Sequence, residues 1–166
     1  MIKVVFAVLM LWATTASADV DAHFSTGVLG ARWGTTLDQV QVMYPGGASW
    51  PNGGERGGEI VYSVPGDFRV LALDIPVPLV HFIFSKENAL TRAVLHFRYS
   101  DREEVLYGTA LVLGQDYSIR DEASARVFQW KPGKASYVGI EIGSGPQFPW
   151  AFLGVRAIEQ KAGVRR

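Results

Sequence analysis

Histidine is the side chain in this sequence best suited to proton transfer or metal binding near neutral pH. A polar turn at 86–88 lies between two strand-like runs, which predicts a β-hairpin. If the hairpin turns about Asn88 and Ala89, His81 and His96 lie directly opposite each other, close enough to share a metal ion or a proton. No third ligand follows at a metal-binding spacing. We therefore expect ordinary half-exposed strand histidines, with no metal ion and no other cofactor.

A serine nucleophile needs a strained elbow between a strand and a helix. The one candidate is Ser144, between Gly143 and Gly145, but Pro146 follows it where a helix would have to start. A flexible turn is the simpler interpretation. The glycine-rich stretch 46–58 also lacks a Gly-Lys-Ser/Thr sequence and follows a helix, which argues against a phosphate-binding loop.

The carboxylates have structural explanations as well. Asp101, Glu103 and Glu104 fall in the first turn of a predicted helix, where the helix dipole favours negative charge. Asp74 precedes Ile75-Pro76 and would be a candidate acid if it were buried, but an exposed strand end is the expected position. No residue is therefore predicted to be catalytic, and we expect a protein that is not an enzyme. A ligand-binding or hydrolytic site built from His81, His96 and Asp74 stays open as a third hypothesis.

Aromatic residues point instead to binding. Trp50 lies in the polar stretch 46–58, followed by Asn52, Glu55 and Arg56. Tryptophan and arginine dominate the energetics of protein interfaces, and a glycine-rich loop can insert into a partner's cleft. The alternative is that Trp50 folds back over a sheet edge.

A second aromatic loop, 145–150, contains Phe148 and Trp150 and is stiffened by prolines. We expect these two residues to contribute to binding together with the Trp50 loop. The two loops could then form one binding rim.

The N-terminus has the three parts of an export signal. Lys3 is followed by the apolar run Val4–Trp12 and by the small residues Ala16-Ser17-Ala18. We expect cleavage after Ala18, because the apolar run is too short for the ~20 residues that a membrane span needs. The sequence predicts a periplasmic or secreted product.

The composition narrows the classes of partner. The chain has no cysteine, which excludes disulfides, thiolate metal sites and a lipid-modified cysteine. Removal of residues 1–18 takes away one lysine and leaves 15 basic against 16 acidic side chains. Such a balance argues against nucleic acid and against an anionic membrane surface. We expect another protein as partner and no membrane insertion, and the sequence leaves the oligomeric state open.

Two helices are expected in the mature chain. The first spans 31–45, with Thr35 as its cap and Pro45 at its end, and the glycine-rich stretch 46–58 follows as a loop. The second begins at Ser100, which has capping-box spacing to Glu103, and ends at Gly114.

The runs with a period of two predict strands. They are Glu59–Val64, Phe68–Asp74, Val80–Ser85, Ala89–Tyr99, Ala125–Trp130, Ser136–Ile142 and Trp150–Ala157. This order predicts one α+β domain, 19–166, in which both helices pack on one face of an antiparallel sheet. Each half has a helix followed by strands, so a tandem repeat is possible.

The segment Trp33-Gly34-Thr35-Thr36-Leu37-Asp38-Gln39-Val40, followed by Tyr44-Pro45, resembles the start of many exported bacterial domains. The Val80 to Phe97 hairpin is also similar to theirs. These domains have the fold of the beta-lactamase-inhibitor proteins and of the small outer-membrane-assembly lipoproteins. The resemblance implies a helical pair on a curved antiparallel sheet and a protein-binding role. The chain departs from the lipoproteins because it has no cysteine to acylate.

The function expected from the sequence is that of a periplasmic or secreted protein-binding domain. Its most specific form is an inhibitor or immunity-type protein that neutralises an enzyme or toxin acting on the cell envelope. An envelope-assembly accessory protein is the alternative.

Overall fold

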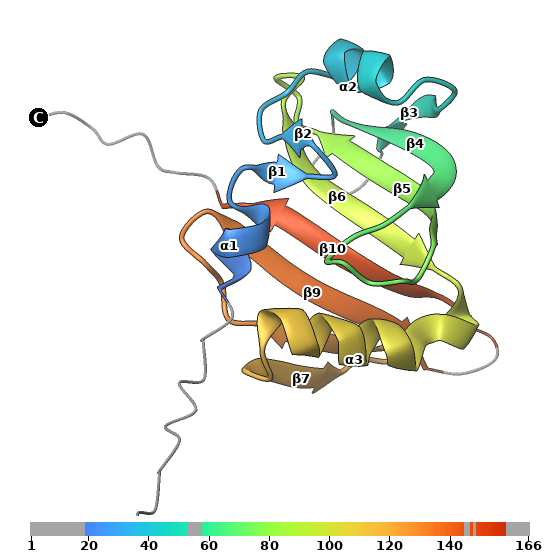
Figure 1. Cartoon of the computed structure of the whole chain (residues 1–166). Helices are drawn as coiled ribbons and strands as arrows, with labels where there is room; N and C mark the ends of the chain where they lie inside the picture. The colour runs from blue at the N-terminus through green and yellow to red at the C-terminus, as the bar shows by residue number, and fades with distance from the viewer. Residues whose placement is uncertain (1–18, 53–57, 145–146, 148, 159–166) are drawn as a thin grey trace, which may run out of the picture.

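An eight-stranded antiparallel sheet dominates the computed structural model, which describes residues 19–52, 58–144, 147 and 149–158 (Figure 1). The strands lie side by side in the order β3-β4-β5-β6-β10-β9-β8-β7. Their bounds are β3 Ala48–Asn52, β4 Glu59–Phe68, β5 Val77–Phe84, β6 Leu90–Phe97, β7 Tyr117–Asp121, β8 Ala125–Trp130, β9 Ser136–Gly143 and β10 Ala151–Ala157.

Three helices and a small hairpin accompany the sheet. The helices are α1 Val20–Phe24, α2 Leu37–Met43 and α3 Arg102–Leu113, and a 3-10 turn, Tyr99–Asp101, leads into α3. The hairpin pairs β1 Gly27–Val28 with β2 Ala31–Arg32. The predicted α+β class is therefore confirmed. None of the helices in the described part of the chain is both long and apolar enough to cross a bilayer.

The same order of elements occurs twice. Helix α2 is followed by the four-stranded meander β3–β6, and helix α3 is followed by the meander β7–β10. The two meanders join through their last strands, because β6 pairs with β10. This pairing is antiparallel. The two halves are therefore arranged about an approximate two-fold axis between β6 and β10, with the same order of strands on either side of it.

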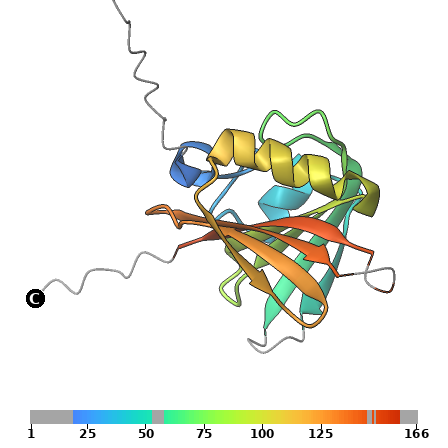
Figure 2. The same ribbon diagram turned by 90° about the horizontal axis from the view of Figure 1, so that it is seen from below.

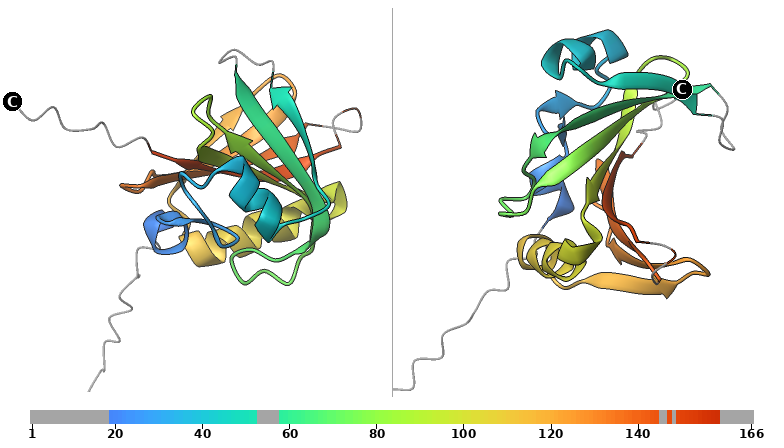
Figure 3. Two further views of the ribbon diagram at one scale, coloured as in Figure 1. Left: turned by 90° about the horizontal axis from the view of Figure 1, so that it is seen from above. Right: turned by 90° about the vertical axis from the view of Figure 1, so that its right-hand side faces the viewer.

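All three helices lie on one face of the sheet, which confirms the prediction for α2 and α3 and adds α1 (Figures 2 and 3). The side chains that point toward them form the core, which includes Phe82 on β5, Leu95 on β6 and Leu153 on β10, each fully buried. Toward β3–β4 and toward β7–β8 the sheet bends away from the helices. The uncovered face is therefore concave.

The first helix is shorter than expected. It begins at Leu37 instead of residue 31, because residues 31 and 32 form β2 and Gly34 has a φ of +83°. Its cap is Thr36 instead of Thr35, and the Thr36 N–H donates to the side-chain oxygen of Gln39 at 3.1 Å. Asn88 in the β5–β6 turn accepts a hydrogen bond from the Leu37 N–H at 3.0 Å, which ties the hairpin to the helix.

Two strand predictions in the first half were wrong. Residues 46–58 were expected to form a loop, but Ala48–Asn52 is strand β3. It lies at the edge of the sheet, where Pro51 is tolerated because an edge strand leaves half of its N–H groups without a ladder partner. The expected strand 68–74 does not form, since β4 continues to Phe68 and the chain then turns with positive φ at Leu71 and Ala72.

In the second half, the helix starts later than predicted. Asp101 and not Ser100 is the cap of α3, and the Ser100 hydroxyl donates to the Asp101 carboxylate at 2.7 Å. The predicted end at Gly114 is confirmed. Strand β7 and helix α1 were not foreseen. The predicted export signal, 1–18, lies outside the described residues and stays a prediction.

Candidate functional site in the concave face

A row of aromatic rings crosses the concave face. It runs from Trp50 on β3 through His81 on β5 and His96 on β6 to Phe152 on β10. Successive ring centroids are 5.8, 4.4 and 5.6 Å apart, so each ring contacts the next. Trp50 is 43% exposed. We call these four residues the aromatic row.

The two histidines in this row form a direct pair. The Nε2 atom of His96 lies 3.2 Å from the Nδ1 atom of His81, within hydrogen-bond distance. The expectation that they lie directly opposite each other was wrong, because His81 pairs with Val94 and His96 with Leu79. They are diagonal neighbours on one face, a spacing that aromatic side chains can bridge.

Burial disfavours the charged form of both imidazoles. It lowers the pKa of His81, and together with the nearby His81 it lowers the pKa of His96 to about 4. Two cationic rings at 3.2 Å would also repel each other. At neutral pH the pair is therefore uncharged, with one ring donating the hydrogen bond and the other accepting it.

A pair of glycines forms the floor of the concave face beside this row. Gly154 on β10 lies directly opposite Gly139 on β9, and on its other side it pairs with Val94. A Cβ atom added to Gly154 would come no closer than 3.8 Å to its nearest neighbour, the Gly139 carbonyl oxygen. Neither glycine is among the described residues with positive φ. Internal packing and backbone conformation therefore do not require glycine at position 154, and a strand-interior glycine of this kind often marks the close approach of another molecule.

Charged side chains border the row. On β6, Arg92 forms an ion pair of 2.6 Å with Glu59 on β4. On β9, burial raises the pKa of Glu141, and a hydrogen bond from Trp150 partly offsets this effect. Both carboxylates lie on the concave face, because Glu141 pairs with Phe152 and Glu59 pairs with Asn52, two residues along β3 from Trp50.

Half of the predicted binding residues lie in the described structure. These are Trp50, Trp150 and Asn52, the last residue of β3, whereas Glu55, Arg56 and Phe148 lie outside the described residues. Trp50 does not belong to a loop but to an edge strand, where it contacts the His81 ring. The sequence singled out Trp50 correctly as a partly exposed aromatic. It gave no indication that Phe152 belongs to the site, because Phe152 lies in a run with the alternating pattern of an ordinary strand.

The expectation of a single rim formed by the two aromatic loops was wrong. Trp50 shares a rung of the sheet with Val61, Ile83, Arg92 and Arg156, whereas Trp150 directly precedes β10 at the opposite end of that strand. Five residues of β10, 151–155, lie between Trp150 and this rung, and three strands lie between β3 and β10. The two tryptophans therefore mark opposite ends of the concave face.

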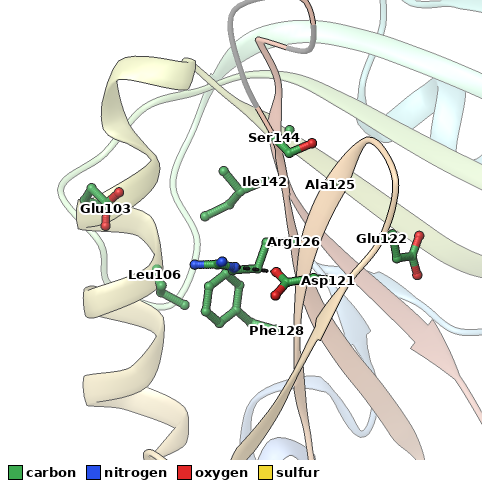
Figure 4. Close-up of a pocket in the computed structure, with 10 residues that line it drawn as sticks. Glu103, Leu106, Asp121, Glu122, Ala125, Arg126, Phe128, Ile142 and Ser144 are labelled. Atoms are coloured by element: carbon green, nitrogen blue, oxygen red, sulfur yellow. Dashed lines mark hydrogen bonds and ion pairs between the residues drawn. The ribbon is translucent and has the colours of Figure 1, made fainter.

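A second hollow lies on the other side of the sheet, between α3 and the β7–β8 turn (Figure 4). It has a volume of about 540 Å³, and Arg126 and Asp121 form an ion pair of 2.6 Å in its wall. Ser144 lies at its edge, exposed, with its backbone N–H bonded to the Ser124 carbonyl. The described lining of this hollow contains the carboxylates of Glu103, Asp121 and Glu122 but no histidine. Ser144 forms a bend directly after β9, in keeping with the expected turn.

The hypothesis of a ligand-binding or hydrolytic site built from His81, His96 and Asp74 loses one of its three residues. Asp74 is exposed and lies in the turn before β5, not on the face that carries His81 and His96. Among the described residues, no group of three or more histidine, aspartate or glutamate side chains is placed to hold a metal ion. What the arrangement offers chemically is an aromatic and partly apolar surface around a neutral histidine pair.

The chain was compared with known proteins on three levels. No family model, curated protein or solved structure matches it. The assignment of a function therefore rests on the geometry of the concave face.

Proposed function

We propose that this chain is an exported protein-recognition domain that binds its partner in the concave face of the sheet. The observation that carries the proposal is the combination of the aromatic row with the glycine floor formed by Gly139 and Gly154 on the one face that the helices leave uncovered. Aromatic side chains supply most of the binding energy in protein interfaces. Small residues beside them let a protruding segment of a partner approach the backbone.

Two properties favour a protein over a small molecule. The face is broad and spans β3 to β9, whereas a drug-sized ligand usually binds in an enclosed pocket. Its border also carries charges of both signs, among them Arg92 and Glu59, which is typical of the rim of an interface. Both families that the sequence resembles bind other proteins, which points in the same direction.

An affinity capture tests this proposal. The mature chain, Asp19 to Arg166, serves as bait for native envelope extract, and retained proteins are quantified by mass spectrometry. Gly154→Leu fills the floor of the concave face, and Trp50→Ala removes one end of the aromatic row. The control is Tyr107→Ala, which truncates a 65% exposed aromatic on α3, on the helix side of the sheet.

The proposal predicts one protein that the wild type and Tyr107→Ala retain and that both concave-face variants lose by about tenfold or more. A toxin or hydrolase would support the inhibitor or immunity form, and an outer-membrane assembly component would support the accessory form. Equal retention by all four baits would contradict binding in the concave face.

A further inference from the structure

The His81–His96 pair has the nitrogen spacing of two ligands to one metal ion. The atoms Nδ1 of His81 and Nε2 of His96 are 3.2 Å apart. Two nitrogens that each lie ~2.0–2.1 Å from one tetrahedral zinc ion are separated by about 3.3 Å. The two ring planes are inclined at 58°, and χ2, the torsion that sets the orientation of each imidazole, is soft in histidine.

The protonation state also suits a metal ligand. Imidazole binds a metal through the neutral form, so protons compete with the ion. Burial lowers the pKa of both rings, which favours the neutral form that can bind a metal ion. The ion pair with Glu59 neutralises Arg92 on the same face, which reduces the repulsion that its guanidinium would exert on a cation.

A buried hydroxyl next to the pair gives an independent indication of a ligand. Ser63 on β4 lies directly opposite His81, so the two side chains are on the same face. Ser63 is 7% exposed, and its Oγ atom has no hydrogen-bond partner among the described residues. Buried hydroxyls are normally paired. A water molecule bound to a metal ion at the histidine pair would supply such a partner.

From this geometry we propose that His81 and His96 form a two-histidine site for a divalent transition-metal ion, with water in the remaining coordination positions. Nitrogen ligands without thiolate suit Cu²⁺, Ni²⁺ and Zn²⁺, and the general order of affinities places Cu²⁺ above Zn²⁺. The half-exposed rings leave one side of the ion open to solvent. The site lies in the middle of the aromatic row, between Trp50 and Phe152.

Titration of the untagged mature protein with Zn²⁺ and with Cu²⁺, followed by calorimetry, tests this site. The expected result is one ion per chain, bound more tightly for Cu²⁺, with an affinity at least about tenfold lower in His81→Gln and in His96→Gln. The control is His23→Ala, which removes the remaining histidine of the chain, on α1. This variant should bind the ion like the wild type.

A measurement on the wild type avoids any dependence on the folding of the variants. In NMR spectra of the imidazole groups, Zn²⁺ should shift the resonances of His81 and His96 and leave those of His23 in place. Absence of binding up to about 1 mM ion would overturn the proposal, and so would binding that both glutamine variants preserve. Neither result affects the capture experiment, which tests protein recognition without added metal.

Discussion

At the scale of single residues, the histidine pair makes the folded molecule sensitive to acid. His96 and His81 are hydrogen-bonded at 3.2 Å on a half-buried face, and burial lowers the pKa of both. A histidine whose pKa is lower in the folded state binds protons more readily when the chain is unfolded. Acid therefore favours unfolding at this position.

We predict that the free energy of unfolding falls as the pH drops from about 6.5, the ordinary value for histidine, to about 4, the value for folded His96. In this window the unfolded chain holds more protons than the folded one. Urea unfolding at several pH values measures the effect. His96→Asn should flatten the profile in this window, whereas an identical profile in the variant would assign the acid sensitivity to other groups.

The sequence foresaw the hairpin and the contact of its two histidines, but not their register. The turn is centred on Glu87 and not on Asn88 and Ala89, because the Ser85 N–H donates to the Ala89 carbonyl, and a bulge between Ile83 and Phe84 then shifts the pairing by one residue. Neither the exact centre of a turn nor a bulge has a clear sequence signal. Trp50 was recognised from its residue type. The contact of Trp50 with His81 was not foreseen. Pro51 and the neighbouring glycines are typical of a loop, so the sequence did not indicate the edge strand that carries Trp50.

At the scale of elements, a single carboxylate fixes the first helix to the sheet. Asp21 in α1 accepts hydrogen bonds from the backbone N–H groups of Lys134, Ala135 and Ser136, and from the Ser136 hydroxyl at 2.9 Å. Burial alone would raise the pKa of Asp21, but these hydrogen bonds outweigh it and the pKa is lowered. The β8–β9 turn is thereby attached to the start of the described chain.

Asp21→Ala should therefore lower the free energy of unfolding at pH 7 by about 1 kcal/mol, the size of a lost helix cap. Because the folded pKa is lowered, this contribution is present above the ordinary carboxyl pKa and is lost as the pH falls through the folded value. Thermal unfolding at pH 7 and at pH 3 measures both. Asp116→Ala, an exposed aspartate after α3, is the control and should have little effect. An equal loss in both variants would contradict a specific role for Asp21.

Helix α1 itself was not foreseen. It spans only Val20–Phe24, one turn and a half, and its stability comes from burial of Val20 and Phe24 and from the contacts of Asp21. Short helices have little intrinsic stability and therefore little sequence signal. By contrast, α3 has 12 residues, and its glycine end was predicted correctly.

At the scale of the whole molecule, the pairing of β6 with β10 creates the concave face. This pairing places Phe152 beside His96 and Gly154 beside Val94, so residues from the two halves share one surface. The alternation in each strand predicted the α+β class and the one-sided helices. It could not predict which strands of the two halves meet, because pairing between distant segments leaves no mark in the local pattern.

The central claim, that the concave face is the binding surface, is tested most directly by photo-crosslinking in the native envelope. Phe152 is replaced by the photoreactive p-benzoylphenylalanine, and in a matched control the same residue replaces Tyr107 on α3. We predict that position 152 forms a specific covalent adduct with one envelope protein and that position 107 does not. An adduct from position 107 with none from position 152 would contradict recognition through the concave face.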